Sequence, residues 1–285
     1  MARKESNKNG KETSNAAVAA KVGYFARTSR PIYALMFLLP FIVLYEILVL
    51  VVNPELLSEP VSNVRGGVVA FVWIQNFLQY IGLDAKNSWL CAPLVIIGIL
   101  LILQVTARQN WKIMWSDFAV MAIECIVISV PLIVLAMVLN RPAQQQPHQV
   151  ACLLAAAKFS HHSFLMDIIT GIGAGLYEEL VFRLILIGLL MLFFETILGI
   201  NKTKAIFLAI VISAVLFSLH HHFVFLNGRF ARAETLTMAP FIFRTAAGVY
   251  FAAIFATRGF GIVAGSHIFY DIIATILNVL LFNQN

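Results

Sequence analysis

Long runs of apolar residues, separated by short polar segments, set the pattern of this chain. The first run, Pro31 to Val52, contains about 22 residues and is long enough to cross a hydrocarbon core of about 30 Å. Asn53-Pro54-Glu55 follows it in place of a small-residue cleavage site, so the run is predicted to be an uncleaved helix and not a signal peptide. The runs from Leu90 to Val105 and from Phe118 to Leu139 are predicted to be further membrane-spanning helices.

The longest apolar run, Phe164 to Ile200, would extend about 55 Å as one straight helix. It must therefore tilt strongly or break, and Gly171, Gly173 and Gly175 are the expected breaking point. Gly171 and Gly175 also form a GxxxG pair through which another helix can approach closely. Three more runs bring the prediction to about seven or eight spans: Ala205 to His221, Leu236 to Ala256 and Phe260 to Leu280.

A weaker run over residues 66–83 is interrupted by Gln75, Asn76 and Gln79. This pattern fits a re-entrant or interfacial helix about as well as a full span, and both interpretations stay open. The chain is expected to divide into three parts. These are a disordered cytoplasmic tail over residues 1–22, N-terminal transmembrane helices over 23–160, and a transmembrane core over 161–285 that carries the polar motifs described next.

Composition supports an all-α, polytopic membrane bundle. Hydrophobic residues make up 60% of the chain and charged residues 12%, against about 25% charged in soluble domains. The net charge of +6 is concentrated in the first thirty residues and predicts a cytoplasmic N-terminus, in a protein of the plasma (inner) membrane. The aromatic or motif context of a nucleic-acid-binding patch does not accompany this charge, so nucleic-acid binding is not expected. Cys91, Cys125 and Cys152 form no CxxC and are read as buried apolar residues without a disulfide.

Three charged residues, Glu178, Glu179 and Arg183, lie within six positions of the longest apolar run. A charge near the bilayer centre costs about 2.5 to 3.5 kcal/mol on insertion scales, so these groups need partners or water. On a helix Glu179 and Arg183 share a face and are expected to form an ion pair. Glu178 lies about 100° round the helix, outside that pair, and is the candidate functional carboxylate.

Two other polar pairs occur at helical spacing in the C-terminal half. Phe217 and His221 are four residues apart near the end of one predicted helix, and His267 and Asp271 are four apart inside the last one. A second GxxxG pair, Gly261 and Gly265, precedes His267. Close packing of the last helix on the glutamate helix would bring these polar groups together.

These three motifs, EExxxR, FxxxH and HxxxD, resemble in order and spacing those of the CPBP intramembrane proteases, over about residues 165–280. That family includes CAAX prenyl endopeptidases and bacteriocin-processing and immunity proteins. The resemblance implies an endopeptidase with a water-accessible site inside the bilayer, acting on a membrane-associated polypeptide. By position, Glu178 and His221 would activate water, and His267 with Asp271 would orient the scissile carbonyl or stabilise the oxyanion. Structural support would come from Glu179, Arg183 and Phe217.

Metal dependence stays open at this point. The family carries both a metalloprotease label and a metal-free interpretation, and the absence of HExxH favours the second. If zinc is used, the expected ligands are Glu178, His221 and His267. Many members have Asn where this chain has Asp271, and an ionised Asp cannot donate a hydrogen bond. Asp271 is therefore expected to be protonated, to orient His267, or to bind metal.

Several polar residues outside the motifs receive weaker expectations. The histidines at 220, 222, 161 and 162 are not expected to be catalytic, and Arg244 needs a counter-charge from Glu46, Glu124 or Asp271. Two other functions are considered, a non-catalytic scaffold or immunity protein of the same fold and a proton-coupled transporter. A transporter would be favoured by internal repeats, and none is visible in the sequence.

Overall fold

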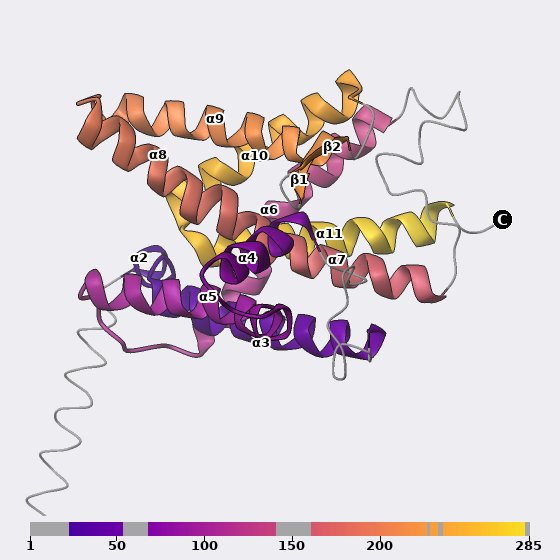
Figure 1. Cartoon of the computed structure of the whole chain (residues 1–285), viewed down its shortest axis with the longest axis horizontal. Coiled ribbons are helices and arrows are strands. Elements are labelled where there is room, and N and C mark those ends of the chain that lie inside the picture. Colours follow the sequence, from indigo (N-terminus) through magenta and orange to yellow (C-terminus); the bar gives the residue numbers. More distant parts are fainter. Residues whose placement is uncertain (1–22, 54–67, 141–160, 227–228, 233–235, 283–285) are drawn as a thin grey trace, which may run out of the picture.

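A computed structural model describes residues 23–53, 68–140, 161–226, 229–232 and 236–282 as a helical bundle with one short hairpin (Figure 1). The predicted all-α class is confirmed. The N-terminal helices are α2 (Tyr24–Thr28), α3 (Pro31–Val52), α4 (Val69–Tyr80), α5 (Ala85–Thr106) and α6 (Ser116–Asn140). The C-terminal helices are α7 (His161–Glu179), α8 (Gly188–Leu192), α9 (Lys202–His222), α10 (Met238–Arg258) and α11 (Phe260–Phe282).

Seven helices within the described residues are long and apolar enough to cross a membrane, as predicted. They are Pro31–Val52, Ala85–Thr106, Ser116–Leu139, Phe164–Ile197, Lys202–His222, Met238–Arg258 and Phe260–Leu280. The protein is therefore an integral, multi-pass membrane protein. The α4 helix has 12 residues and is about 18 Å long, too short for a span, so the structure favours the re-entrant or interfacial interpretation of residues 66–83.

The predicted break at Gly171, Gly173 and Gly175 is wrong. The α7 helix passes through all three glycines, and the helical segment continues to Ile197. A Cβ on Gly171 would lie 2.7 Å from Cβ of Asp271, and a Cβ on Gly175 would lie 2.7 Å from the backbone N of Ile268. These glycines therefore serve as contact points for α11, which lies beside α7 (Figure 1), and the close approach expected from GxxxG is confirmed.

The departure from regular α-helix comes later, at the π-helical segment Leu180–Ile187. A π turn closes i→i+5 hydrogen bonds and is frequent at functional sites. Ser213 of α9 donates to the carbonyl oxygen of Phe182 at 2.7 Å, inside this segment. This buried bond ties α9 to the widened turn directly after the glutamate pair.

Replacing Gly175 by alanine is expected to lower the Tm of the protein in detergent. The new methyl group would meet Ile268 at both its side chain and its backbone, and overpacking of this kind costs about 1 to 3 kcal/mol. Gly188→Ala is the matched control, because a Cβ at Gly188 meets nothing within 4 Å. Thermal unfolding of the two variants in parallel checks the prediction. Equal Tm values would show that α7 and α11 do not pack closely at this glycine.

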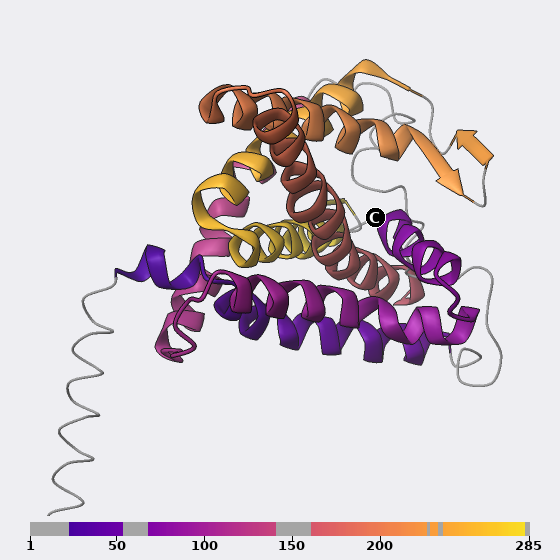
Figure 2. The ribbon, with the colours of Figure 1, turned by 60° about the vertical axis from the view of Figure 1, so that its left-hand side comes forward.

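The last helix lies between two groups of partners. Its own glycines face away from α7. Gly261 meets Ala34 of α3, and Gly265 meets Phe37 of α3 and Cys125 of α6. The expected close packing of the last helix on the glutamate helix is confirmed, but α7 alone contributes the glycines there, and the second GxxxG pair packs on α3 and α6. Helices from both sides of the expected boundary at residue 160 share one hydrophobic core, which also includes the α3–α5 pair seen in Figure 2.

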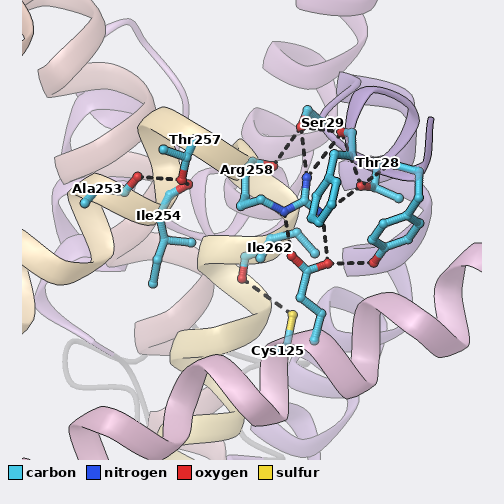
Figure 3. A network of polar contacts seen from close by, with 11 residues as sticks. Thr28, Ser29, Cys125, Ala253, Ile254, Thr257, Arg258 and Ile262 are labelled. Carbon is cyan, nitrogen blue, oxygen red and sulfur yellow. Dashed lines mark hydrogen bonds and ion pairs between the residues drawn. The ribbon is translucent and has the colours of Figure 1, made fainter. Parts of the chain in front are cut away.

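A polar network at one end of α10 anchors the short α2 helix (Figure 3). Arg258 binds Glu124 of α6 with Nη2 at 2.8 Å from Oε2 and donates to Thr28 Oγ1 at 3.0 Å. The hydroxyl of Tyr24 donates to the same carboxylate at 2.6 Å. Glu124, one of the counter-charges considered for Arg244, thus pairs with Arg258. Cys125 and Cys91 are free thiols, as predicted, and Cys152 and the expected tail at 1–22 lie outside the described residues.

A hairpin follows directly on α9. Strands β1 (Phe223–Leu226) and β2 (Arg229–Arg232) pair antiparallel, with Leu226 opposite Arg229. The backbone N–H of Phe223 donates to the carbonyl of Leu219 and ends the helix. The hairpin extends from the end of α9 that carries the histidines (Figure 2), and it was not predicted from the sequence.

Candidate active site

The unpaired carboxylate of Glu178 faces two histidines of α9. Glu178 is the second-last residue of α7 and is buried, with 6% of its surface exposed. Its Oε1 lies 3.3 Å from Nε2 of His220. One carboxylate oxygen of Glu178 and one ring nitrogen each of His220 and His221 all lie within 4.8 Å of one another. The expected pairing of Glu178 with α9 is present, but the histidine at hydrogen-bond distance is His220.

Both histidines are oriented by one backbone group. Nδ1 of His220 and Nδ1 of His221 both contact the carbonyl oxygen of Phe217, the second at 2.9 Å. A carbonyl oxygen only accepts, so each Nδ1 carries the hydrogen and, in the neutral ring, each Nε2 carries the lone pair. The two basic nitrogens are therefore directed away from the helix backbone.

The contribution of His220 was missed in the sequence because the FxxxH spacing selects His221. A signal was nevertheless present. In the last turn of a helix, residues at i+3 and i+4 can both bring a side chain back to the carbonyl of residue i, and here those residues are two consecutive histidines. Trp73 of α4 also contacts His220, with ring centroids 6.0 Å apart, so α4 covers this side of the site.

Glu179 binds two cationic groups. Its Oε2 lies 3.0 Å from Nε of Arg183, so the predicted ion pair is confirmed, and both side chains are fully buried. Its Oε1 lies 2.7 Å from Nδ1 of His267 on α11. The second contact was not predicted. It makes Glu179 the link between the EExxxR motif and the last helix.

His267 lies between two carboxylates. Nδ1 faces Glu179, and Nε2 lies 3.5 Å from Oδ2 of Asp271, one turn later on α11. Nδ1–H donates to Glu179, and an imidazole with a carboxylate facing each ring nitrogen is stabilised as the cation. Its ring also stacks on Phe251 of α10, with centroids 4.7 Å apart. His267 is thus held as a cation between two carboxylates, whereas Nε2 of His220 faces the single carboxylate of Glu178.

The ring of Phe217 lies among the three motifs. The guanidinium carbon of Arg183 lies 4.2 Å from its centroid, and the ring of His267 lies 6.1 Å away. Among the described residues, the two terminal nitrogens of Arg183 have no hydrogen-bond partner, so the face of the aromatic ring supplies part of their stabilisation. Phe217 therefore supports the site with its ring as well as with its carbonyl.

The predicted site residues fall into two adjoining groups. One contains Glu178 with His220 and His221, and the other contains His267 with Glu179 and Asp271. The groups are close enough for Glu178 and His267 to interact electrostatically. The zinc set expected from the sequence takes ligands from both groups, whereas the three ligand atoms that the fold brings together all belong to the first.

Residues 160–273 match the family model described as type II CAAX prenyl endopeptidase Rce1-like. This segment is Rce1-like. It contains all three motifs, and the resemblance to the CPBP proteases drawn from those motifs is confirmed for this part of the chain. No curated protein and no solved structure matches the chain. Helices α3 to α6 precede the Rce1-like segment, yet α3 and α6 pack against its last helix and α4 contacts His220.

Proposed function

We propose that this protein is an intramembrane endopeptidase that hydrolyses a peptide bond in a membrane-associated polypeptide. The observation that carries the proposal is the buried carboxylate of Glu178, held beside the imidazoles of His220 and His221 and close to a third imidazole, His267, which lies between two carboxylates. Amide hydrolysis needs a base for water and a positive donor where negative charge develops. These two requirements correspond to the two groups of the site.

Water would be held and deprotonated between Glu178 and the α9 histidines. The hydroxide attacks the scissile carbonyl carbon, and the proton taken by the site passes to the nitrogen of the departing amine. The predicted partner of Glu178 was His221. The contact at 3.3 Å supports a part for His220 in this step beside His221.

The oxyanion would be stabilised by His267. Its Nε2–H contacts Asp271 at 3.5 Å, a long distance that leaves the proton available to a substrate carbonyl oxygen. Of the three roles considered for Asp271, we propose that it orients His267, because its carboxylate lies beside that ring and, when ionised, cannot donate to an oxyanion. Glu179 orients the same ring from the other side and receives its own support from Arg183.

The Rce1-like match supports a polypeptide at the membrane as the substrate. We propose that a prenylated C-terminal CaaX segment is the first class to test, with the N-terminus on the cytoplasmic side of the plasma membrane. The non-catalytic alternative is less well supported, since the chain has the carboxylate of Glu178 and three histidines, two of them buried, in two adjoining groups. The transporter alternative has no observation in its favour.

Purified protein in proteoliposomes is expected to release a C-terminal fragment from a farnesylated CaaX peptide, measured by mass spectrometry. His267→Ala is expected to slow release by about 100-fold or more, as loss of one oxyanion donor does in other hydrolases. An unprenylated peptide of the same sequence tests whether the lipid is needed. Equal rates for the wild type and His267→Ala would assign the cleavage to another protein and overturn the proposal.

A further inference from the structure

The contact between Glu178 and His220 joins two groups that both offer lone pairs. Nδ1 of His220 donates to the carbonyl of Phe217, so the neutral ring presents an acceptor at Nε2. The carboxylate oxygen of Glu178 lies 3.3 Å from that nitrogen. Two acceptors at this distance repel each other in a buried site unless a proton or a cation lies between them. The geometry therefore requires a positive group at this position.

A third acceptor points to the same position. His221 also has its Nδ1 bound to Phe217, and one of its ring nitrogens belongs to a set, with Glu178 and His220, in which all ligand atoms lie within 4.8 Å of one another. Around a tetrahedral ion with bonds of about 2.0 to 2.1 Å, ligand atoms lie about 3.4 Å apart. The distance of 3.3 Å between Oε1 of Glu178 and Nε2 of His220 already meets that value. Every other pair of ligand atoms lies within 4.8 Å, so metal binding would shorten any of these distances by at most about 1.4 Å, the difference between 4.8 and 3.4 Å.

The surroundings of the two histidines are those of metal ligands. A ligating histidine almost always donates its other ring N–H to a carboxylate or a backbone carbonyl, which fixes the tautomer and the ring orientation. The carbonyl of Phe217 does this for both His220 and His221. His267 differs, since both of its nitrogens face carboxylates and neither presents a lone pair.

We propose that Glu178, His220 and His221 bind one first-row divalent cation, and that zinc fits the set best. Two imidazoles and one carboxylate suit zinc and related ions, and three protein ligands leave a fourth position open. When bound, such an ion supplies a Lewis acid that makes a water molecule more acidic. The use of the ion in hydrolysis rests on the proposed function, but its binding does not. His220 becomes a ligand that none of the three motifs includes, and His267 remains outside the set.

The test uses the full chain without an oligohistidine tag, in detergent, after treatment with chelator. Titration with Co²⁺ is followed by visible absorption, and bound metal is counted by elemental analysis. The wild type is expected to bind one Co²⁺ per chain with the intense bands of a four-coordinate ion. His220→Ala is expected to bind at least about 100-fold more weakly. His267→Ala is the matched control from the same site and is expected to keep the wild-type affinity and spectrum.

Three results would overturn the proposal. These are a folded wild type that binds no stoichiometric Co²⁺, a His220→Ala variant that binds as tightly as the wild type, and a His267→Ala variant that loses as much affinity as His220→Ala. If His220→Ala does not fold, His220→Gln takes its place, and Co²⁺ should raise the Tm of the wild type and His267→Ala but not of His220→Gln.

Cleavage is measured on the same preparations, so the two proposals fail separately. If the wild type cleaves its substrate at full rate without binding Co²⁺ or Zn²⁺, the proposed metal site is wrong and the proposed peptidase activity stands. It would show that a proton, and not a metal ion, lies between Glu178 and His220. If the wild type binds one Co²⁺ per chain and cleaves no membrane polypeptide, the proposed metal site stands and the proposed peptidase activity is wrong.

Discussion

Glu178→Gln is expected to reduce kcat/KM for peptide cleavage by about 1000-fold or more, with the Tm close to that of the wild type. The amide has nearly the same shape as the carboxylate and keeps one oxygen toward His220, so the packing of α7 and α9 is preserved. An amide is a poor proton acceptor and a poor metal ligand, and loss of a general base costs about 100- to 10,000-fold. The rate of fragment release and the Tm are measured on the same preparation.

Glu46→Gln is the matched control for this variant. Glu46 is also an intramembrane carboxylate, on α3, and it accepts a hydrogen bond from the hydroxyl of Tyr177 at 3.2 Å. It touches none of the three histidines of the site in the described part of the chain, so its amide variant is expected to cleave at the wild-type rate. A Glu178→Gln protein that kept more than about a tenth of the activity would show that the base is another residue.

Arg183→Met is expected to destabilise the protein by about 3 to 5 kcal/mol, the usual cost of removing one member of a buried ion pair. Glu179 and Arg183 are both fully buried, and the substitution leaves the carboxylate with His267 as its partner. It also removes the guanidinium from the face of Phe217. The free energy of unfolding in detergent is measured by denaturant titration, with Arg108→Met, at an exposed position, as the control.

The double variant Glu179→Gln with Arg183→Met separates charge from packing. Removing both charges is expected to recover a large part of the stability, since neutral replacement of a buried pair is often tolerated. Activity is not expected to return, because His267 loses the carboxylate that charges and orients its ring. A single variant as stable as the wild type would show that water or lipid headgroups reach Arg183. A double variant with full activity would show that Glu179 does not position His267.

The local spacing of charged residues predicted one contact of the site directly. Glu179 and Arg183 are four residues apart, and any regular or nearly regular helix places such residues on one face, so the pair could be inferred without knowing a second helix. The same argument correctly left Glu178 outside the pair. It said nothing about His267, because that contact joins residues on two helices.

Helix rotation explains why the sequence did not show that His220 also lies next to Glu178. His220 and His221 are about 100° apart on α9, and either can face α7 after a modest turn of the helix about its axis. That turn is set by contacts outside the motif. Ser213 binds the carbonyl of Phe182 at 2.7 Å, and Gly248 of α10 admits Ala214 of α9 with no room for a side chain. Neither contact has a signature in the linear sequence.

The glycines of α7 also show that contacts between helices cannot be read from the sequence. Their spacing indicates a smooth helix face, which the structure contains, but a smooth face is equally compatible with a break and with a close neighbour. Asp271 and Ile268 of α11 fill the space beside Gly171 and Gly175, and this neighbour keeps the helix continuous. The widened turn comes instead at Leu180–Ile187, where Ser213 binds a backbone carbonyl.

The sequence by itself determined the membrane class, the approximate ends of the long helices, the Glu179–Arg183 pair and the family resemblance over the C-terminal half. Each of these depends on run length, on spacing within one helix or on motifs in order, which are properties of neighbouring residues in the chain. Only the tertiary structure decided that His220 faces Glu178, that Glu179 binds His267 and that α11 lies between α7 and α3. Those contacts depend on how each helix is rotated about its axis and shifted along its neighbours. Many weak packing contacts throughout the bundle determine both the rotation and the shift.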